Sequence, residues 1–403
     1  MKFRVIQYSI YTCLGILICY VLLRSFLYVI REPVWGVLDE TAHMDYIEKL
    51  SNGKFIFNTD SLVEKSIFES LVYTRWGKPK EFDGSVYSAG IAALSYELHQ
   101  PPLYYLIMTV PNLIMIHGGF SLVQRVMALR LLSWLIFLVA LFIGFLSMNN
   151  LLKKLGFKST ILPAMIYVLF LTLLGSIGRY SVSNDWLPLL FVNIIIYLLT
   201  KLYFDNDKKC IGYIHITIAG LCLIKQTYFP LAIIFFFIAS IIEASFYKSA
   251  FYYITYIPVL LWYSMFFYQW HEIKISKAIF NLILPAGMVD FKTFMLILLS
   301  NAFNWKAIFP FSFTPQLWIF SLFFFTLFAV IYFNKSGFIF FIVMIVLFVL
   351  IIMMYVLNKW IGGVHWYSYR HFNGYGFFIF MGAFGWLIYV FDWIKLYIQR
   401  IIS

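Results

Sequence analysis

The chain has 403 residues, of which 63% are hydrophobic and only 12% carry a charge. Because a soluble domain of this size needs a far more polar surface, this composition excludes a water-soluble globular protein. The net charge of +12 does not indicate a nucleic-acid partner, since Lys and Arg lie mostly in short connectors between apolar runs. Repeated apolar runs of about 20 residues predict an all-α, polytopic membrane protein that contacts membrane lipids and no nucleic acid.

The first apolar run covers roughly residues 6–30 and follows two cations, Lys2 and Arg4. It resembles a signal peptide, but it continues to Ile30 without a small-residue cleavage site, so an uncleaved first span is expected. The N-terminal cations predict that the N-terminus lies in the cytoplasm. Residues 31–100 are then a large first loop on the outer, extracytoplasmic side.

Ten further apolar stretches follow this loop. They cover roughly residues 102–118, 126–150, 159–178, 186–203, 211–226, 228–247, 249–268, 314–333, 337–357 and 374–393. The basic connectors all fall on the cytoplasmic side only if the stretch 102–118 does not cross the membrane. A re-entrant or interfacial segment is therefore expected there. The prediction is one integral-membrane domain, residues 1–403, with about 10–11 transmembrane helices and a second outer loop at 269–312.

The segment LDETAHMDYIEKL, residues 38–50, has helical spacing. Asp39, His43 and Tyr46 fall at i, i+4 and i+7 and therefore share one face, beside an apolar stripe. One interpretation is a capped helix on the membrane surface, with Asp39 and Glu40 at its positive dipole end. The other is a catalytic site, in which one carboxylate takes a proton from a hydroxyl and the other holds the orientation.

A second polar segment, YELHQPPLYY at 96–105, ends the first loop. Its double proline, Pro101 and Pro102, predicts an extended turn before the apolar run. His99 is either a hydrogen-bonded turn residue or a functional group.

The predicted topology places three more polar segments on the outer side. They are RYSVSND at 179–185, KQTY at 225–228 and HWYSYRHFNGY at 365–375, whereas the cytoplasmic side carries only scattered lysines. This asymmetry favours chemistry at the outer face.

The motif DE-x-x-H after the first span, followed by QPPLYY some 50–60 residues later, resembles the GT-C membrane glycosyltransferases. These include protein O-mannosyltransferases and the aminoarabinose transferases of lipid A. The resemblance covers the first 105 residues and continues loosely in SVSNDWL (181–187) and KQTY. YSYRHFNGY (367–375) is similar to a Gly-Arg-Tyr segment of related families but lacks the usual Gly directly before Arg370.

The resemblance implies inverting transfer of a sugar from a polyprenyl-phosphate donor to a glycan or lipid-linked acceptor. Asp39 is the implied catalytic base, with Glu40 beside it. The departing lipid phosphate needs cations at the membrane surface. The candidates are Lys225, Arg370 and Arg179, and ordinary snorkelling of these long side chains is the alternative.

The candidate substrate contacts share a polar or aromatic side chain in the predicted outer segments. They are His43, Tyr46, His99, Gln100, Asn184, Asp185, Tyr228 and His371. For Asn184 and Asp185 the alternative is capping of the next helix, before Pro188.

No cofactor is expected, because the predicted outer segments contain no Asp-x-Asp pattern. Asp39, Glu40 and His43 could together hold a divalent cation, so metal dependence stays open. The chain length and the Phe-, Ile- and Tyr-rich composition resemble O-antigen glucosyltransferases that modify bacterial lipopolysaccharide. That narrower resemblance implies a location in the bacterial inner membrane, with the site on the periplasmic side.

Two other functions are compatible with a polytopic chain. An O-antigen-type polymerase would depend on arginines in two outer loops, and a non-enzymatic transporter or flippase of lipid-linked sugars would carry charges at mid-span. The acid-rich first loop favours the transferase.

Overall fold

The computed structural model describes part of the chain. The described residues are 2–35, 40–55, 63–70, 73–74, 78–79, 98, 100–157, 159–177, 181–248, 250–270, 342–343, 345–346, 375, 377–378 and 380–381. The chain divides into two compact units, Met1–Lys277 and Ala278–Ser403, and nearly all of the described residues belong to the first. The expected loop 269–312 and the last three expected spans lie largely outside the described residues, so the single-domain organisation stays a prediction.

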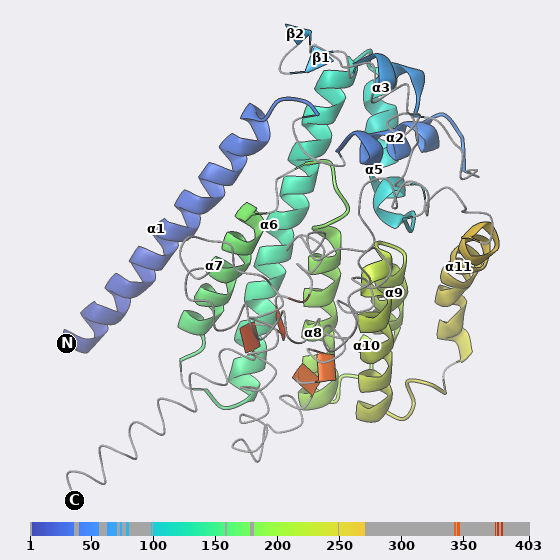
Figure 1. Ribbon diagram of the computed structural model, residues 1–403. Helices are drawn as coiled ribbons and strands as arrows, with labels where there is room; N and C mark the ends of the chain where they lie inside the picture. The colour runs from blue at the N-terminus through green and yellow to red at the C-terminus, as the bar shows by residue number, and fades with distance from the viewer. Residues whose placement is uncertain are drawn as a thin grey trace, which may run out of the picture. The chain divides into compact units, whose positions relative to one another are not determined.

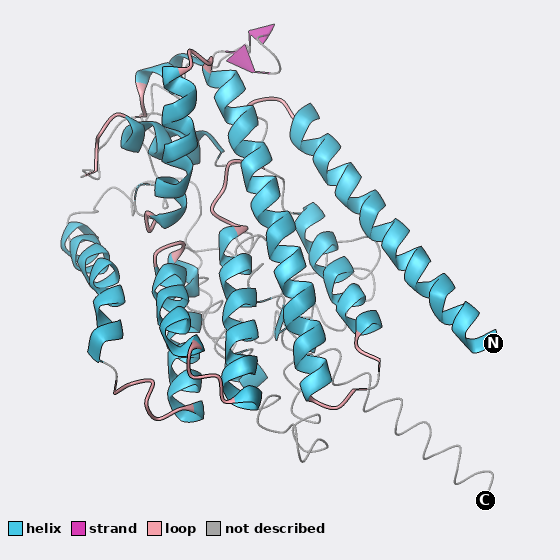
Figure 2. Cartoon of the chain, turned by 180° about the vertical axis from the view of Figure 1, so that it is seen from behind, coloured by secondary structure: helices cyan, strands magenta, loops and turns pink. Residues whose placement is uncertain are grey.

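The described part of the first unit is almost entirely helical (Figures 1 and 2). Its elements are α1 (Lys2–Arg31), α2 (Glu40–Ser51), α3 (Lys65–Ser70), β1 (Tyr73–Thr74), β2 (Lys78–Pro79), α5 (Leu103–His117), α6 (Leu122–Lys154), α7 (Ile161–Ile177), α8 (Leu187–Asp205), α9 (Cys210–Cys222), η2 (Gln226–Tyr228), α10 (Phe229–Ile242), η3 (Ala250–Tyr256) and α11 (Ile257–Trp270). The two strands form one short antiparallel pair. The predicted helical class is confirmed for these residues.

Three described helices are long and apolar enough to cross a membrane: Tyr8–Arg31 within α1, α6, and α8. Helix α5 has 15 residues and is therefore roughly 22 Å long, shorter than the ~30 Å hydrocarbon layer. Its length fits the expectation that 102–118 does not simply cross. The expected extended turn at Pro102 is wrong, because Pro102 already has helical angles, φ −85° and ψ −11°.

A buried polar node joins α6, α7 and α8. The Asn193 side chain donates to the carbonyl of Ala140 at 2.9 Å and accepts from the Tyr167 hydroxyl at 2.9 Å. Ser147 donates to the Asn193 carbonyl at 2.7 Å. Gly144 lies against this node, since a Cβ there would be 2.8 Å from Asn193 Nδ2. Close approach at a small residue and interhelical hydrogen bonds are how apolar helices associate in lipid.

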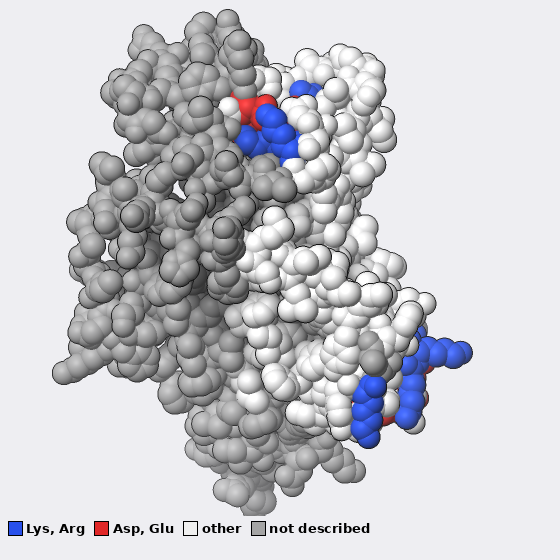
Figure 3. All heavy atoms as spheres, turned by 90° about the vertical axis from the view of Figure 1, so that its right-hand side faces the viewer, with Lys and Arg blue, Asp and Glu red and all other residues white. Residues whose placement is uncertain are grey.

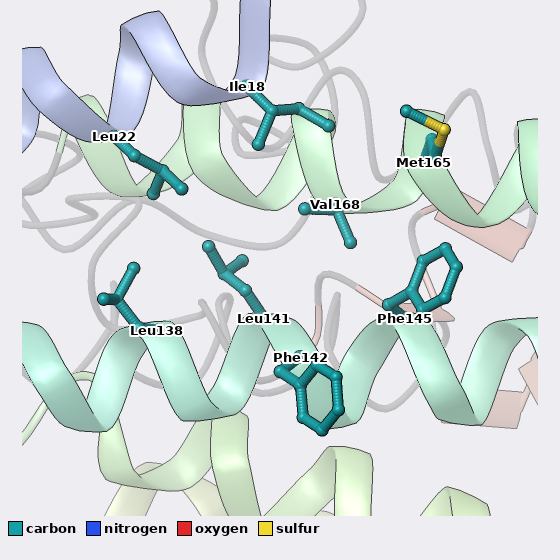
Figure 4. Close-up of a pocket in the computed structure, with 8 residues that line it drawn as sticks. All are labelled: Ile18, Leu22, Leu138, Leu141, Phe142, Phe145, Met165 and Val168. Carbon is teal, nitrogen blue, oxygen red and sulfur yellow. The ribbon is translucent and has the colours of Figure 1, made fainter. Parts of the chain in front are cut away.

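Helix α1 packs against α7 and α6 and leaves an apolar groove of about 250 Å³ between the three helices (Figure 4). Every lining side chain is hydrophobic: Ile18, Leu22, Leu138, Leu141, Phe142, Phe145, Met165 and Val168. The groove offers no group to a sugar or a phosphate, so it is not the candidate site.

Helices of alternating direction bring the polar connectors to two ends. At the first end, the backbone N–H of Leu103 donates to the carbonyl of Leu223 at 2.8 Å, so the start of α5 meets the end of α9. We call this the α2 end; it comprises α2 and residues 100–105, 181–187 and 223–228.

The second end carries most of the described lysines of the connectors. Lys154 pairs with Asp205, and Lys208 pairs with Glu243 at 3.0 Å, which joins the ends of α6, α8, α9 and α10. We call the connectors 153–160, 205–210 and 243–249 the lysine end. Figure 3 shows basic side chains gathered there, low on the visible face.

The close approach at Gly144 predicts a stability difference between two glycine variants. Gly144→Ala should destabilise the protein by about 1–3 kcal/mol, because the new methyl group forces Asn193 and Tyr167 apart. The matched control is Gly15→Ala, where a Cβ meets nothing within 4 Å and gains up to about 1 kcal/mol of helix propensity. Thermal unfolding of the detergent-solubilised chain should separate the two; equal midpoints would contradict the tight contact.

Candidate functional site

Glu40, the first residue of α2, is held in a buried ion pair with Arg130 of α6. Arg130 Nε donates to Glu40 Oε1 at 2.6 Å and Nη2 donates to Oε2 at 2.5 Å, and both side chains are 0% exposed. The backbone N–H of Val182 adds a bond to Oε1 at 3.2 Å, and that of Trp35 adds one to Oε2 at 3.3 Å. Each Glu40 oxygen therefore accepts two hydrogen bonds.

The same guanidinium also binds the backbone at the end of α1. Arg130 Nη1 donates to the carbonyl of Glu32 at 2.6 Å, and Nη2 donates to that of Pro33 at 2.9 Å. Arg130 thus fixes the end of α1 and the start of α2 to α6, and Glu40 in turn holds Val182. We call this set of contacts the Arg130 clamp.

Sequence reasoning missed Arg130, although a signal was present. Arg130 lies in the third turn of an apolar helix, and an ionisable residue inside such a helix is by default paired or functional. The expected span begins at residue 126, which places Arg125 in a connector, whereas α6 begins at Leu122. Both arginines therefore lie inside α6, near its start.

The remaining carboxylates of α2 are also paired. Asp45 binds Lys49 at 2.7 Å and accepts from the backbone N–H of Glu64 at 2.6 Å. Glu48 pairs with Arg125, and Asn112 of α5 donates to Glu48 at 3.0 Å.

Almost the whole of α2 is buried. Residues Ala42 to Leu50 are all buried, and so is Glu40. The interpretation of this segment as a helix on the membrane surface is therefore wrong, because its charges are satisfied by α5, α6 and the 63–70 segment rather than by water. The predicted helix itself is confirmed.

His43 and Tyr46 lie on one face of α2, as their spacing predicts, and both contact Tyr105 of α5. The Tyr105 hydroxyl is 2.8 Å from His43 Nδ1, and the Tyr46 and Tyr105 rings stack at 4.0 Å. The Tyr46 hydroxyl donates to the carbonyl of Gln100 at 3.4 Å. Burial raises the pKa of Tyr46, so this hydroxyl keeps its proton.

Lys225 and Asp185 form a second buried ion pair, between residues 40 positions apart. Ser183 donates to the other oxygen of Asp185 at 2.6 Å. The alternative that Lys225 snorkels to the membrane surface is wrong, because its side chain is buried and Asp185 compensates its charge. A phosphate could use Lys225 only by taking the place of Asp185.

The neighbouring Asn184 side chain donates to the carbonyl of Ile224 at 3.3 Å. Its buried Oδ1 has no hydrogen-bond partner among the described residues. The capping alternative is wrong for Asn184 and Asp185, because α8 begins at Leu187 after Trp186, without a side-chain cap.

The structure brings together all of the predicted site residues that it describes. The residues at the α2 end are Glu40, His43, Tyr46, Gln100, Asn184, Asp185, Lys225 and Tyr228. Tyr228 lies in η2, and its backbone N–H donates to the Lys225 carbonyl at 3.0 Å. Asp39, His99, Arg179, Arg370 and His371 lie outside the described residues.

Within the described ranges, no group of three or more His, Cys, Asp or Glu residues could hold a metal ion. The predicted Asp39, Glu40 and His43 set is not tested, because Asp39 is not described. The Asp-x-Asp of the chain, Asp205 to Asp207, lies at the lysine end, where Asp205 pairs with Lys154.

The Arg130 clamp predicts strongly coupled mutations. Arg130→Met or Glu40→Gln alone should destabilise the protein by about 3–5 kcal/mol, because the remaining partner stays buried without compensation. The double variant should lose much less than the sum of the two single variants.

Thermal unfolding in detergent measures this coupling. The control is Lys54→Gln, which removes a partly exposed pair with Glu64 and should change stability by about 1 kcal/mol or less. Additive losses in the double variant would show that the two side chains act independently.

Comparison with known proteins found no relative: no protein-family model, no curated protein and no solved structure matches the chain.

Proposed function

We propose that the chain is a membrane glycosyltransferase of GT-C type. It moves a sugar from a polyprenyl-phosphate donor to a glycan or lipid-linked acceptor, such as O-antigen, at the periplasmic face of a bacterial inner membrane. The observation that carries the proposal is the meeting of four polar segments at the α2 end, each from a different part of the chain. Apolar helices keep such side chains where they are paired or where they do chemistry.

The distribution of charge supports the proposed orientation. The lysine end carries most of the exposed lysines among the described connectors, and such residues are enriched on the cytoplasmic side of a membrane. The α2 end then faces outward, where a lipid-linked donor presents its sugar.

In this proposal Asp39 takes the proton of the acceptor hydroxyl while that oxygen attacks the anomeric carbon. A new bond from carbon to the acceptor oxygen forms, the bond to the lipid phosphate breaks, and the phosphate leaves with the bonding pair. The configuration at the anomeric carbon is inverted. Glu40 does not share this role, because Arg130 and two backbone N–H groups occupy its oxygens.

Glu40 serves instead to hold the backbone beside Asp39. The Arg130 clamp fixes the residue that follows Asp39 in the chain, and a catalytic base needs a fixed position more than a second carboxylate. This division of roles fits the expectation that one carboxylate reacts and the other holds the orientation.

Lys225 is the proposed cation for the departing phosphate. In the free enzyme it is bound by Asp185, and in the complex the phosphate replaces that carboxylate. Asp185 keeps its bond from Ser183 throughout, which lowers the cost of releasing the lysine.

Loss of Asp39 should abolish transfer. In membranes supplied with a labelled polyprenyl-phosphate sugar, Asp39→Asn should lower turnover by about 10²–10⁴-fold, the usual contribution of a general base. The matched control is Asp205→Asn, the same chemical change at the lysine end, which should keep full turnover. If the Asp39→Asn protein folds and transfers sugar normally, Asp39 is not the base; if label crosses the membrane without transfer, the chain is a flippase.

Lys225 and Asp185 should affect different kinetic constants. Lys225→Gln should lower kcat, because the phosphate charge develops as it departs, while Asp185→Asn should lower the donor KM, because the lysine no longer has to leave a carboxylate. Lys208→Gln, which breaks an ion pair at the lysine end, is the control and should change neither. A loss of folded protein without any kinetic change would assign the pair a purely structural role.

A further inference from the structure

The segment between α10 and α11 has an unusual backbone. Seven residues, η3 (Ala250–Tyr256), form a 3₁₀ helix that runs directly into α11. Runs of this kind longer than three or four residues are uncommon, so contacts to other elements must hold it. Side chains three apart eclipse each other in a 3₁₀ helix and therefore form straight rows.

Three aromatic residues of this segment, Phe246, Tyr252 and Tyr256, contact His215 of α9. The His215 ring stacks on Phe246 at 3.8 Å and on Tyr252 at 5.3 Å. Its Nδ1 is 3.2 Å from the Tyr256 hydroxyl and its Nε2 is 3.2 Å from the Phe246 carbonyl. A Cβ on Gly212 would be 2.9 Å from the Tyr252 ring, which shows how closely η3 lies on α9.

The outward row is apolar and exposed. Phe251, Ile254 and Ile257 follow at i, i+3 and i+6 and are 77%, 59% and 48% exposed. Because Tyr252 and Tyr256 contact His215 of α9, the row of Phe251, Ile254 and Ile257 is held pointing away from α9.

Two lysines precede the elements that meet at this row. Lys248 precedes η3 and Lys209 precedes α9, both are exposed, and no ion pair between described residues involves either one. Glu243, the acidic residue of the same turn, is already engaged by Lys208 at 3.0 Å. Hydrogen bonds from Ser245, first from its backbone N–H, and the contact with Lys208 lower the pKa of Glu243 to about 2, so this ion pair persists.

We propose that Phe251, Ile254 and Ile257, together with Lys248 and Lys209, form a docking surface for an anionic phospholipid at the lysine end. The apolar row enters the boundary between headgroups and acyl chains, and the two lysines bind the headgroup phosphate. An apolar face beside lysines is the pattern of interfacial binding to anionic lipid. This surface shares no residue with the α2 end and does not depend on the proposed transferase activity.

Photoactivatable lipids test this proposal on the full-length chain in nanodiscs. Phosphatidylglycerol should label the peptide around residues 247–257 more strongly than phosphatidylcholine, and added salt should reduce the preference. Lys209→Gln with Lys248→Gln should weaken phosphatidylglycerol labelling by roughly fivefold per lysine. Phe251→Ser with Ile254→Ser should reduce labelling by both lipids.

Controls separate the lipid from other sources of phosphate and from general effects. Lys54→Gln, which changes an exposed lysine just after α2, should leave the labelling unchanged. Soluble glycerophosphate should not compete, and competition would assign the lysines to a free phosphate instead of a lipid. Unchanged preference in the double lysine variant, or labelling confined to other peptides, would overturn the proposal.

Discussion

The organisation of the α2 end depends on one constraint: a guanidinium buried inside an apolar bundle must be paired. Arg130 lies in α6 at 0% exposure, and desolvation of an isolated charge there is far too unfavourable to persist. Glu40 supplies the charge, and the carbonyls of Glu32 and Pro33 accept the remaining donors. These carbonyls follow the end of α1, where backbone acceptors have no partner within the helix. The clamp therefore satisfies a helix end and an ion pair at once.

Helix lengths explain how this pairing can exist beside a membrane. With 33 residues, α6 is roughly 50 Å long and exceeds the ~30 Å hydrocarbon layer. Arg125 and Arg130 both lie in its first turns, at the α2 end. The shorter α5 lies beside α2 at the same end, and Asn112 contributes to the Glu48 and Arg125 pair. The excess length of α6 and the short length of α5 thus create a protein-lined region in which carboxylates can be held.

Sequence patterns predicted the parts of this arrangement that depend on local spacing. Apolar runs predicted the helices, and the i, i+3 relation of His43 and Tyr46 predicted a shared face, which both use to contact Tyr105. Partners distant in the chain were not predictable, because a sequence shows that Arg130 is charged but not that Glu40 lies 90 residues away in contact with it. The surface-helix interpretation of α2 was wrong for the same reason: an apolar stripe does not show whether lipid or α5 covers it.

Trp35 shows that distant contacts impose the backbone conformation just after α1. Its φ of 63° lies in the left-handed region, which a bulky residue adopts at a strain of about 1–3 kcal/mol. Its backbone N–H donates to Glu40 and its indole N–H donates to Ser70 at 3.1 Å, so two bonds offset that strain. Local sequence preference would select another conformation here. The chemistry proposed for Asp39 therefore rests on Arg130, which holds Glu40 in place to accept the bond from Trp35.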